Sequence, residues 1–118
     1  MANVSLRDAE ITGVNHLKEN QELLMYAHLQ SNEKCQLVFQ AVAWWELCSF
    51  GVDNVLSAID AYDANSLTEG VINEHDIGDP HVKMVRNGPN SLFILHASVG
   101  LSGWVIAQKM VVKAVKKE

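Results

Sequence analysis

The stretch AVAWWELCSF, residues 41–50, places two tryptophans side by side where the only charged residue is Glu46. Consecutive side chains point about 100° apart on a helix and to opposite faces on a strand, so Trp44 and Trp45 cannot lie on one surface. What each indole contacts therefore decides the architecture. Ser31 or Asn32 is suited to cap a helix that begins at Glu33, and the apolar spacing predicts that this helix runs to Phe50.

On a helix over residues 33–50, Trp45 belongs to an inward stripe with Leu37, Val38, Ala41, Val42, Cys48 and Ser49. The opposite arc is also largely apolar. A helix that is apolar nearly all round is either central in its domain or covered by a second subunit. We therefore expect a homodimer, and the predicted interface consists of Phe39, Ala43, Trp44, Leu47 and Phe50.

Helical spacing recurs in the rest of the chain. Residues 16–30, 52–67 and 91–116 each place apolar side chains three and four positions apart. The predicted fold is a single all-α domain over residues 1–118, a compact bundle of four or five helices around a central apolar helix. The alternative is an α+β fold in which Asn87-Gly88 forms the turn of a hairpin between strands at residues 81–86 and 91–97.

Composition and charge narrow the functional class. The chain has 118 residues and a net charge of −5, with 13 acidic and 3 basic residues before position 81 and 6 basic and one acidic residue after it. Lys113, Lys116 and Lys117 are expected to stabilise the C-terminus of a last helix. Without interleaved aromatic residues they do not indicate nucleic-acid binding. Residues 91–108 are uncharged but interrupted by small and polar residues, so a soluble buried helix is favoured over a membrane span.

The two cysteines and the N-terminal sequence indicate a cytoplasmic protein. Cys35 and Cys48 lie 13 positions apart, which on one helix is about 20 Å and too far for a disulfide. Buried free thiols are typical of a reducing compartment. Residues 1–10 do not have the basic start and apolar core of a secretory signal.

The sequence EHDIGDPH, residues 74–81, holds the only cluster with potential chemistry. His75, Asp79 and His81 are weak candidates for metal ligands, because imidazole and carboxylate groups suit zinc, iron or manganese. Their spacing matches no established metal motif, so we expect a solvated loop, no metal and no cofactor.

Nucleophilic motifs and phosphate-binding loops are absent from the sequence, which argues against an enzyme. The predicted function is a protein-binding module without catalytic activity, such as an adaptor, a secretion or assembly chaperone, or an immunity-type protein. An acidic body favours a basic protein partner. The alternative function is a small metal-binding protein or enzyme that uses residues 74–81.

Overall fold

The computed structural model describes residues 6–115, and it shows that the prediction of an all-α bundle is wrong. Strands account for 52% of the structure and helices for 15%. The strands are β1 (Ala9–Leu17), β2 (Glu22–His28), β3 (Lys34–Gln40), β4 (Trp44–Cys48), β5 (Val55–Tyr62), β6 (Ser91–Val99), β7 (Ser102–Ala107) and β8 (Lys109–Ala114). The helices are α1 (Glu69–Glu74), α2 (Asp79–Arg86) and a 3-10 turn, η1 (Lys18–Asn20). None of the helices in this part of the chain is long and apolar enough to span a membrane.

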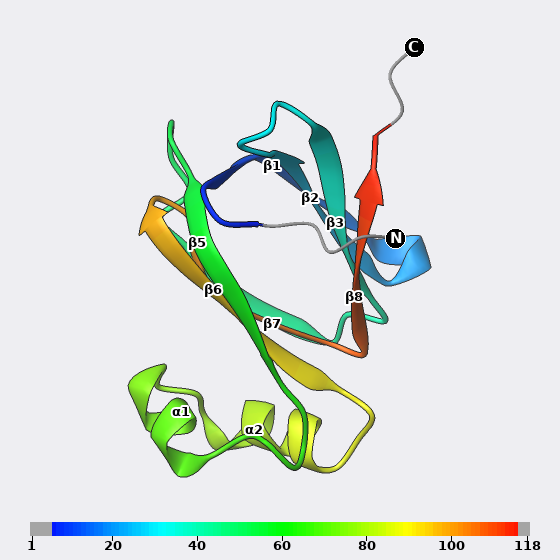
Figure 1. Cartoon of the computed structure of the whole chain (residues 1–118). Helices are drawn as coiled ribbons and strands as arrows, with labels where there is room; N and C mark the ends of the chain where they lie inside the picture. The colour runs from blue at the N-terminus through cyan, green and yellow to red at the C-terminus, as the bar shows by residue number, and fades with distance from the viewer. Residues whose placement is uncertain (1–5, 116–118) are drawn as a thin grey trace.

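All strand pairs are antiparallel, in the order β4-β7-β6-β5-β1-β2-β3-β8. A corner joins β3 to β4, and another joins β7 to β8. Because β3 pairs with β8 and β4 pairs with β7, the four strands form one long two-stranded ribbon that bends at these corners. At the corner the Ala43 N–H donates to the Ile106 carbonyl at 2.8 Å, and the Gln108 N–H donates to the Gln40 carbonyl at 3.0 Å. The bend brings the two ends of the sheet round toward each other, and the sheet curls around its own inner face (Figure 1).

The main core fills the inside of this curled sheet. Side chains from nearly every strand meet there, including Ile11, Met25, Leu37, Phe39, Leu56, Leu95 and Val105. Phe39 and Phe93 pack edge to face with ring centroids 5.5 Å apart. Burial of this size is sufficient to stabilise a domain of 118 residues without a metal or a disulfide.

A second core lies outside the sheet, where α1 and α2 cover β6 and β7 (Figure 1). Leu92 and Ile94 of β6 face the helices, whereas Phe93 and Leu95 face the inner core. Strands that are buried on both faces read as continuous apolar runs without alternation. This is why residues 91–116 were predicted to be a helix, and that prediction is wrong.

The tryptophan pair lies on a strand. Along β4 the exposure alternates, so that Trp44, Glu46 and Cys48 are exposed while Trp45 and Leu47 are partly buried against the inner core. The predicted helix over residues 33–50 is replaced by β3, a corner and β4. The left-handed backbone at Ala41, with φ of 51°, forms part of that corner.

The alternative hairpin at Asn87-Gly88 is not formed either. Residues 81–86 belong to α2, which begins after Gly78 with Pro80 in its first turn, and Asn87 is the C-cap of this helix. Proline at the start of a helix leaves no backbone hydrogen bond unmade. Residues 91–97 do form a strand, as the alternative proposed, but their partners are β5 and β7.

The strands β4 and β8 are the two edges of the sheet. Lys109 and Lys113 are exposed on β8, so Lys113 does not stabilise a helix C-terminus as predicted. Lysine on an edge strand opposes pairing with another chain. Lys116 and Lys117 lie outside the described residues.

Candidate functional site around strand β4

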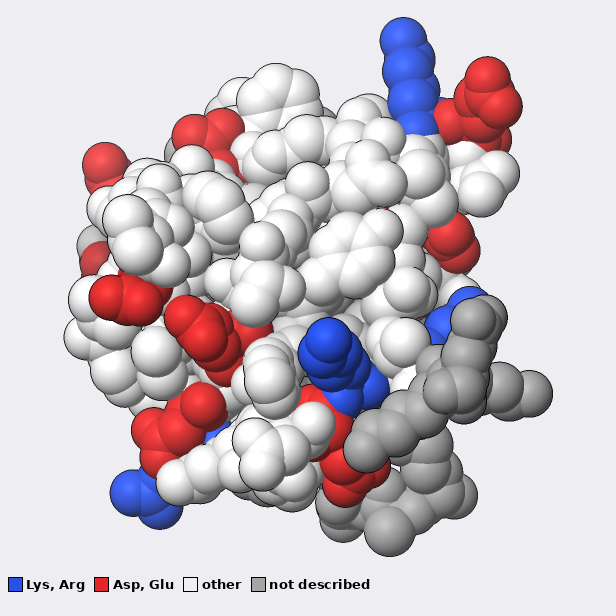
Figure 2. All heavy atoms as spheres, turned by 90° about the horizontal axis from the view of Figure 1, so that it is seen from above, with Lys and Arg blue, Asp and Glu red and all other residues white. Residues whose placement is uncertain are grey.

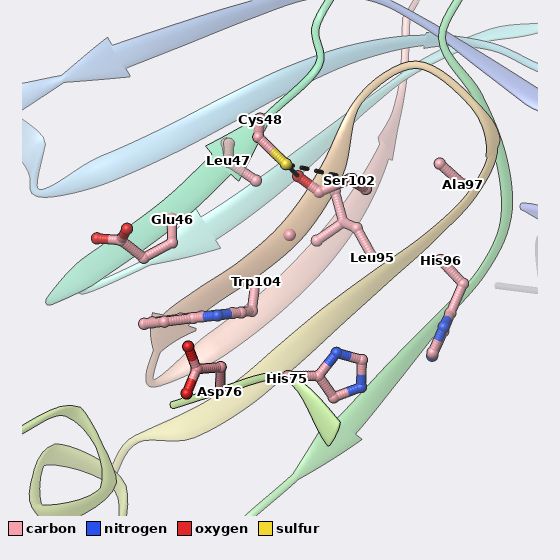
Figure 3. A pocket seen from close by; sticks show the side chains of 11 residues that line it. Glu46, Leu47, Cys48, His75, Asp76, Leu95, His96, Ala97, Ser102 and Trp104 are labelled. Atoms are coloured by element: carbon pink, nitrogen blue, oxygen red, sulfur yellow. Dashed lines mark hydrogen bonds between the residues drawn. The ribbon is translucent and has the colours of Figure 1, made fainter. Parts of the chain in front are cut away.

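A cleft of about 560 Å³ opens beside the outward face of β4. We call it the β4 cleft, and Figure 3 shows its side chains. Its lining comes from β4, from the segment after α1, and from the hairpin of β6 and β7: Glu46, Leu47, Cys48, His75, Asp76, Leu95, His96, Ala97, Ser102, Gly103 and Trp104. Within this lining the only residues with a formal charge at neutral pH are the acids Glu46 and Asp76.

The structure separates the candidate metal ligands of residues 74–81. His75 contributes to the β4 cleft, Asp79 is in the first turn of α2, and His81 contacts two tryptophans. Over residues 6–115, no three His, Cys, Asp or Glu side chains are grouped so that they would hold a metal ion. The three candidates therefore do not share one site.

Two histidines contact each other in the β4 cleft (Figure 3). His75, the C-cap of α1, and His96 of β6 have ring centroids 6.0 Å apart in an edge-to-face arrangement. Each has a carboxylate neighbour, because His75 Nε2 lies 3.0 Å from Glu74 Oε2 and His96 Nε2 lies 2.9 Å from Asp60 Oδ2. The end of α1 and the strands β5 and β6 therefore meet at one part of the cleft.

Cys48 is an exposed thiol in the upper part of the cleft (Figure 3). Its Sγ lies 3.4 Å from Ser102 Oγ, and no hydrogen bond from it to a histidine is found in the described structure. A cysteine nucleophile normally needs such a base in reach. The other cysteine, Cys35, is buried, and burial together with the nearby Glu33 carboxylate raises the pKa of its thiol.

An aromatic stack joins β4 to the helical layer. His81 of α2 lies between Trp44 and Trp104, with ring centroids 5.0 Å and 5.3 Å away. The Trp44 Nε1–H donates to Glu46 Oε2 at 2.7 Å, which fixes the exposed indole along the strand. Contacts of this kind between aromatic rings contribute about 0.5–1.5 kcal/mol each beyond area burial.

Exposed apolar side chains gather around the loop that follows β4. Phe50 is 52% exposed and Val52 is 95% exposed, although both are apolar. Phe50 and Val14 line a common hollow, and Val99 pairs with Val55 directly after this loop. A group of apolar side chains in solvent at one place marks an interaction surface more often than single exposed residues do.

The predicted interface residues do not form the single line that a helix would have given. Phe39 is fully buried in the inner core, and Leu47 points toward that core. Ala43, Trp44 and Phe50 are exposed on the corner, on β4 and after it. A dimer through these three residues stays a prediction.

Several residues of the site were not singled out from the sequence. Asp60 and His96 come from neighbouring strands, where Ala58 pairs with His96 and Asp60 with Ile94. Their contact depends on that register, for which the sequence carries no local signal.

Charge on the outer surface is uneven. In the view of Figure 2, acidic side chains lie mostly around the rim of a broad uncharged area, and basic side chains are few. Comparisons with protein-family models, with curated proteins and with solved structures give no match.

Proposed function

We propose that this chain is a protein-binding module without catalytic activity, whose contact surface is the exposed side of β4 with the loop after it. The observation that carries the proposal is the exposure of apolar side chains along β4, with Trp44 at its beginning and Phe50 and Val52 in the loop after its end. Aromatic side chains with a hydrogen-bonded polar end are common anchors of protein interfaces.

The charges beside this surface favour a basic partner. Glu46 lies on β4 itself, and Asp53 follows Val52 in the loop. The adjacent β4 cleft adds Asp76, and its lining includes neither lysine nor arginine. Complementary charges raise the rate of association and disfavour partners of the same sign.

The experiment is site-specific photocrosslinking in cells of the source organism. A photoreactive phenylalanine analogue replaces Val52, whose side chain is almost fully exposed, and the matched control carries the analogue at Lys83 on the exposed side of α2. The expected result is a crosslinked protein at position 52 that is missing at position 83 and is lost when Trp44→Ala is added. Identification of the crosslinked chain by mass spectrometry then gives the partner.

Two outcomes decide between forms of the proposal. A crosslink to a different, basic protein supports a module that covers such a partner, whereas a crosslink to a second copy of this chain supports self-association through β4. Equal crosslinking at both positions, or none at position 52, would overturn the proposal.

A further inference from the structure

A second cavity lies where the end of β1 meets the beginning of β4. Within residues 6–115, no backbone hydrogen-bond ladder pairs β1 with β4, so a gap lined by side chains separates the two strands. We refer to this gap as the seam. We call this cavity, of about 580 Å³, the seam pocket. Its lining is His16, Lys18, Gln21, Val42, Ala43, Trp44 and Trp45.

The backbone around the seam pocket is fixed on both sides. The Val42 N–H donates to the Gln21 carbonyl at 2.8 Å, and the Ala43 N–H donates to the Ile106 carbonyl at 2.8 Å. Trp45 is held by His16, whose ring lies edge-on with the centroids 4.8 Å apart. A ligand that enters such a pocket does not have to order its walls, which lowers the free-energy cost of binding.

The lining combines aromatic walls with one cation. The Trp45 indole and the aliphatic side chains of Val42 and Ala43 offer flat and apolar surface, which suits a planar ring. Lys18 is the only lining residue with a formal charge at neutral pH, and it makes no ion pair in the described part of the chain. In a chain with a net charge of −5, a lining that contains a lysine and no carboxylate favours an anion.

We propose that the seam pocket binds a small planar apolar molecule that carries a carboxylate. The ring packs against Trp45 and Val42, and the carboxylate lies at the Lys18 ammonium within reach of the Gln21 side chain. The volume falls within the range of about 300–1,000 Å³ that is usual for small-molecule sites, and such sites pair an apolar wall with a few polar groups. This site goes beyond the protein-binding function and does not depend on it.

The test uses two probes that share a ring and differ in charge, 2-naphthoate and the neutral 2-naphthalenemethanol. Binding is followed by NMR through the three tryptophan indole N–H signals, which are assigned with single Trp→Phe variants. The expected result is a saturable shift of the Trp45 signal by 2-naphthoate, while the Trp104 signal stays in place. The neutral probe is expected to bind roughly three- to tenfold more weakly, as one partly solvated ion pair requires.

Lys18→Gln removes the charge on an exposed side chain and leaves the fold intact, so it is the decisive variant. It is expected to bring the affinity for 2-naphthoate down to that for the neutral probe. Lys83→Gln on α2 is the matched control and is expected to change neither affinity. The proposal is overturned if the Trp45 signal does not respond, if the two probes bind the wild-type protein equally, or if both lysine variants behave alike.

Discussion

The side-chain oxygen of Asn54 accepts a hydrogen bond from the Leu101 N–H at 3.0 Å, across 47 positions of sequence. The same oxygen accepts from the Gly51 N–H at 2.9 Å, and the side-chain nitrogen donates to the Gly51 and Ile11 carbonyls. Asn54 is 2% exposed and is the one buried polar residue of the described chain. It ties the loop after β4 to β1 and to the turn between β6 and β7.

Asn54→Ala is expected to lower the free energy of unfolding by roughly 3–5 kcal/mol, because it leaves the buried Leu101 N–H and Ile11 carbonyl without their side-chain partner and releases the part-buried contacts to Gly51. Chemical denaturation followed by circular dichroism measures the change. Asn65→Ala in the exposed turn after β5 is the control, and about 0.5 kcal/mol or less is expected there. Equal losses in the two variants would contradict the role given to Asn54.

His81→Ala is expected to destabilise the protein by about 1–2 kcal/mol, since the imidazole contacts two indoles and holds α2 against β4. Tryptophan fluorescence is expected to change in the folded state as well. His81→Phe keeps a ring between the tryptophans and is expected to recover most of the stability. If the phenylalanine variant is no more stable than the alanine variant, the stack does not contribute as described.

The two cysteines are expected to differ in reactivity toward a thiol reagent such as Ellman's reagent. Cys48 is exposed, whereas Cys35 is buried and the pKa of its thiol is raised. The reactive thiolate of Cys35 is therefore scarce until the pH rises above the ordinary pKa of a cysteine. One thiol is therefore expected to react quickly at pH 8 and the other only after denaturation. Cys48→Ser should remove the fast phase, and a fast phase that survives this variant would contradict the assignment.

Replacing Lys109 and Lys113 together with valine is expected to cause self-association, because it removes the charges that guard the free edge of β8. Size-exclusion chromatography over a range of concentrations measures the effect. Lys83→Val combined with Arg86→Val changes the net charge equally on α2, away from that edge, and is expected to stay at the wild-type mass. Identical profiles for the two double variants would show that the edge is not protected by these lysines.

The apolar segments were correctly expected to pack in the core, but the secondary structure predicted for them was wrong. Trp45 was correctly expected to point inward, but a strand achieves this by alternation with Trp44 and Glu46, in a segment of only five residues. In β6 and β7 both faces are buried, against the inner core and against α1 and α2, so the period of two is lost. A run of this kind fits helical spacing equally well, and only tertiary packing distinguishes the two.

The candidate site was less predictable than the core. Residues 74–81 were recognised as a cluster, yet α2 begins inside it and directs His75 and His81 to different surroundings. The contact between His96 and Asp60 requires the strand register, and the role of Asn54 requires three separate segments to meet. None of these relationships has a local sequence signature.

The bent ribbon of β3–β4 and β7–β8 also determines when its strands can pair during synthesis. Cys35 pairs with Ala114, so the partner of β3 is synthesised roughly 80 residues after it. Pairings between such distant segments carry a large loop-closure entropy and slow the folding reaction. Until β7 and β8 have been synthesised, β4 has no partner strand and β3 is paired only with β2. The unpaired edges make the nascent chain prone to aggregation at that stage.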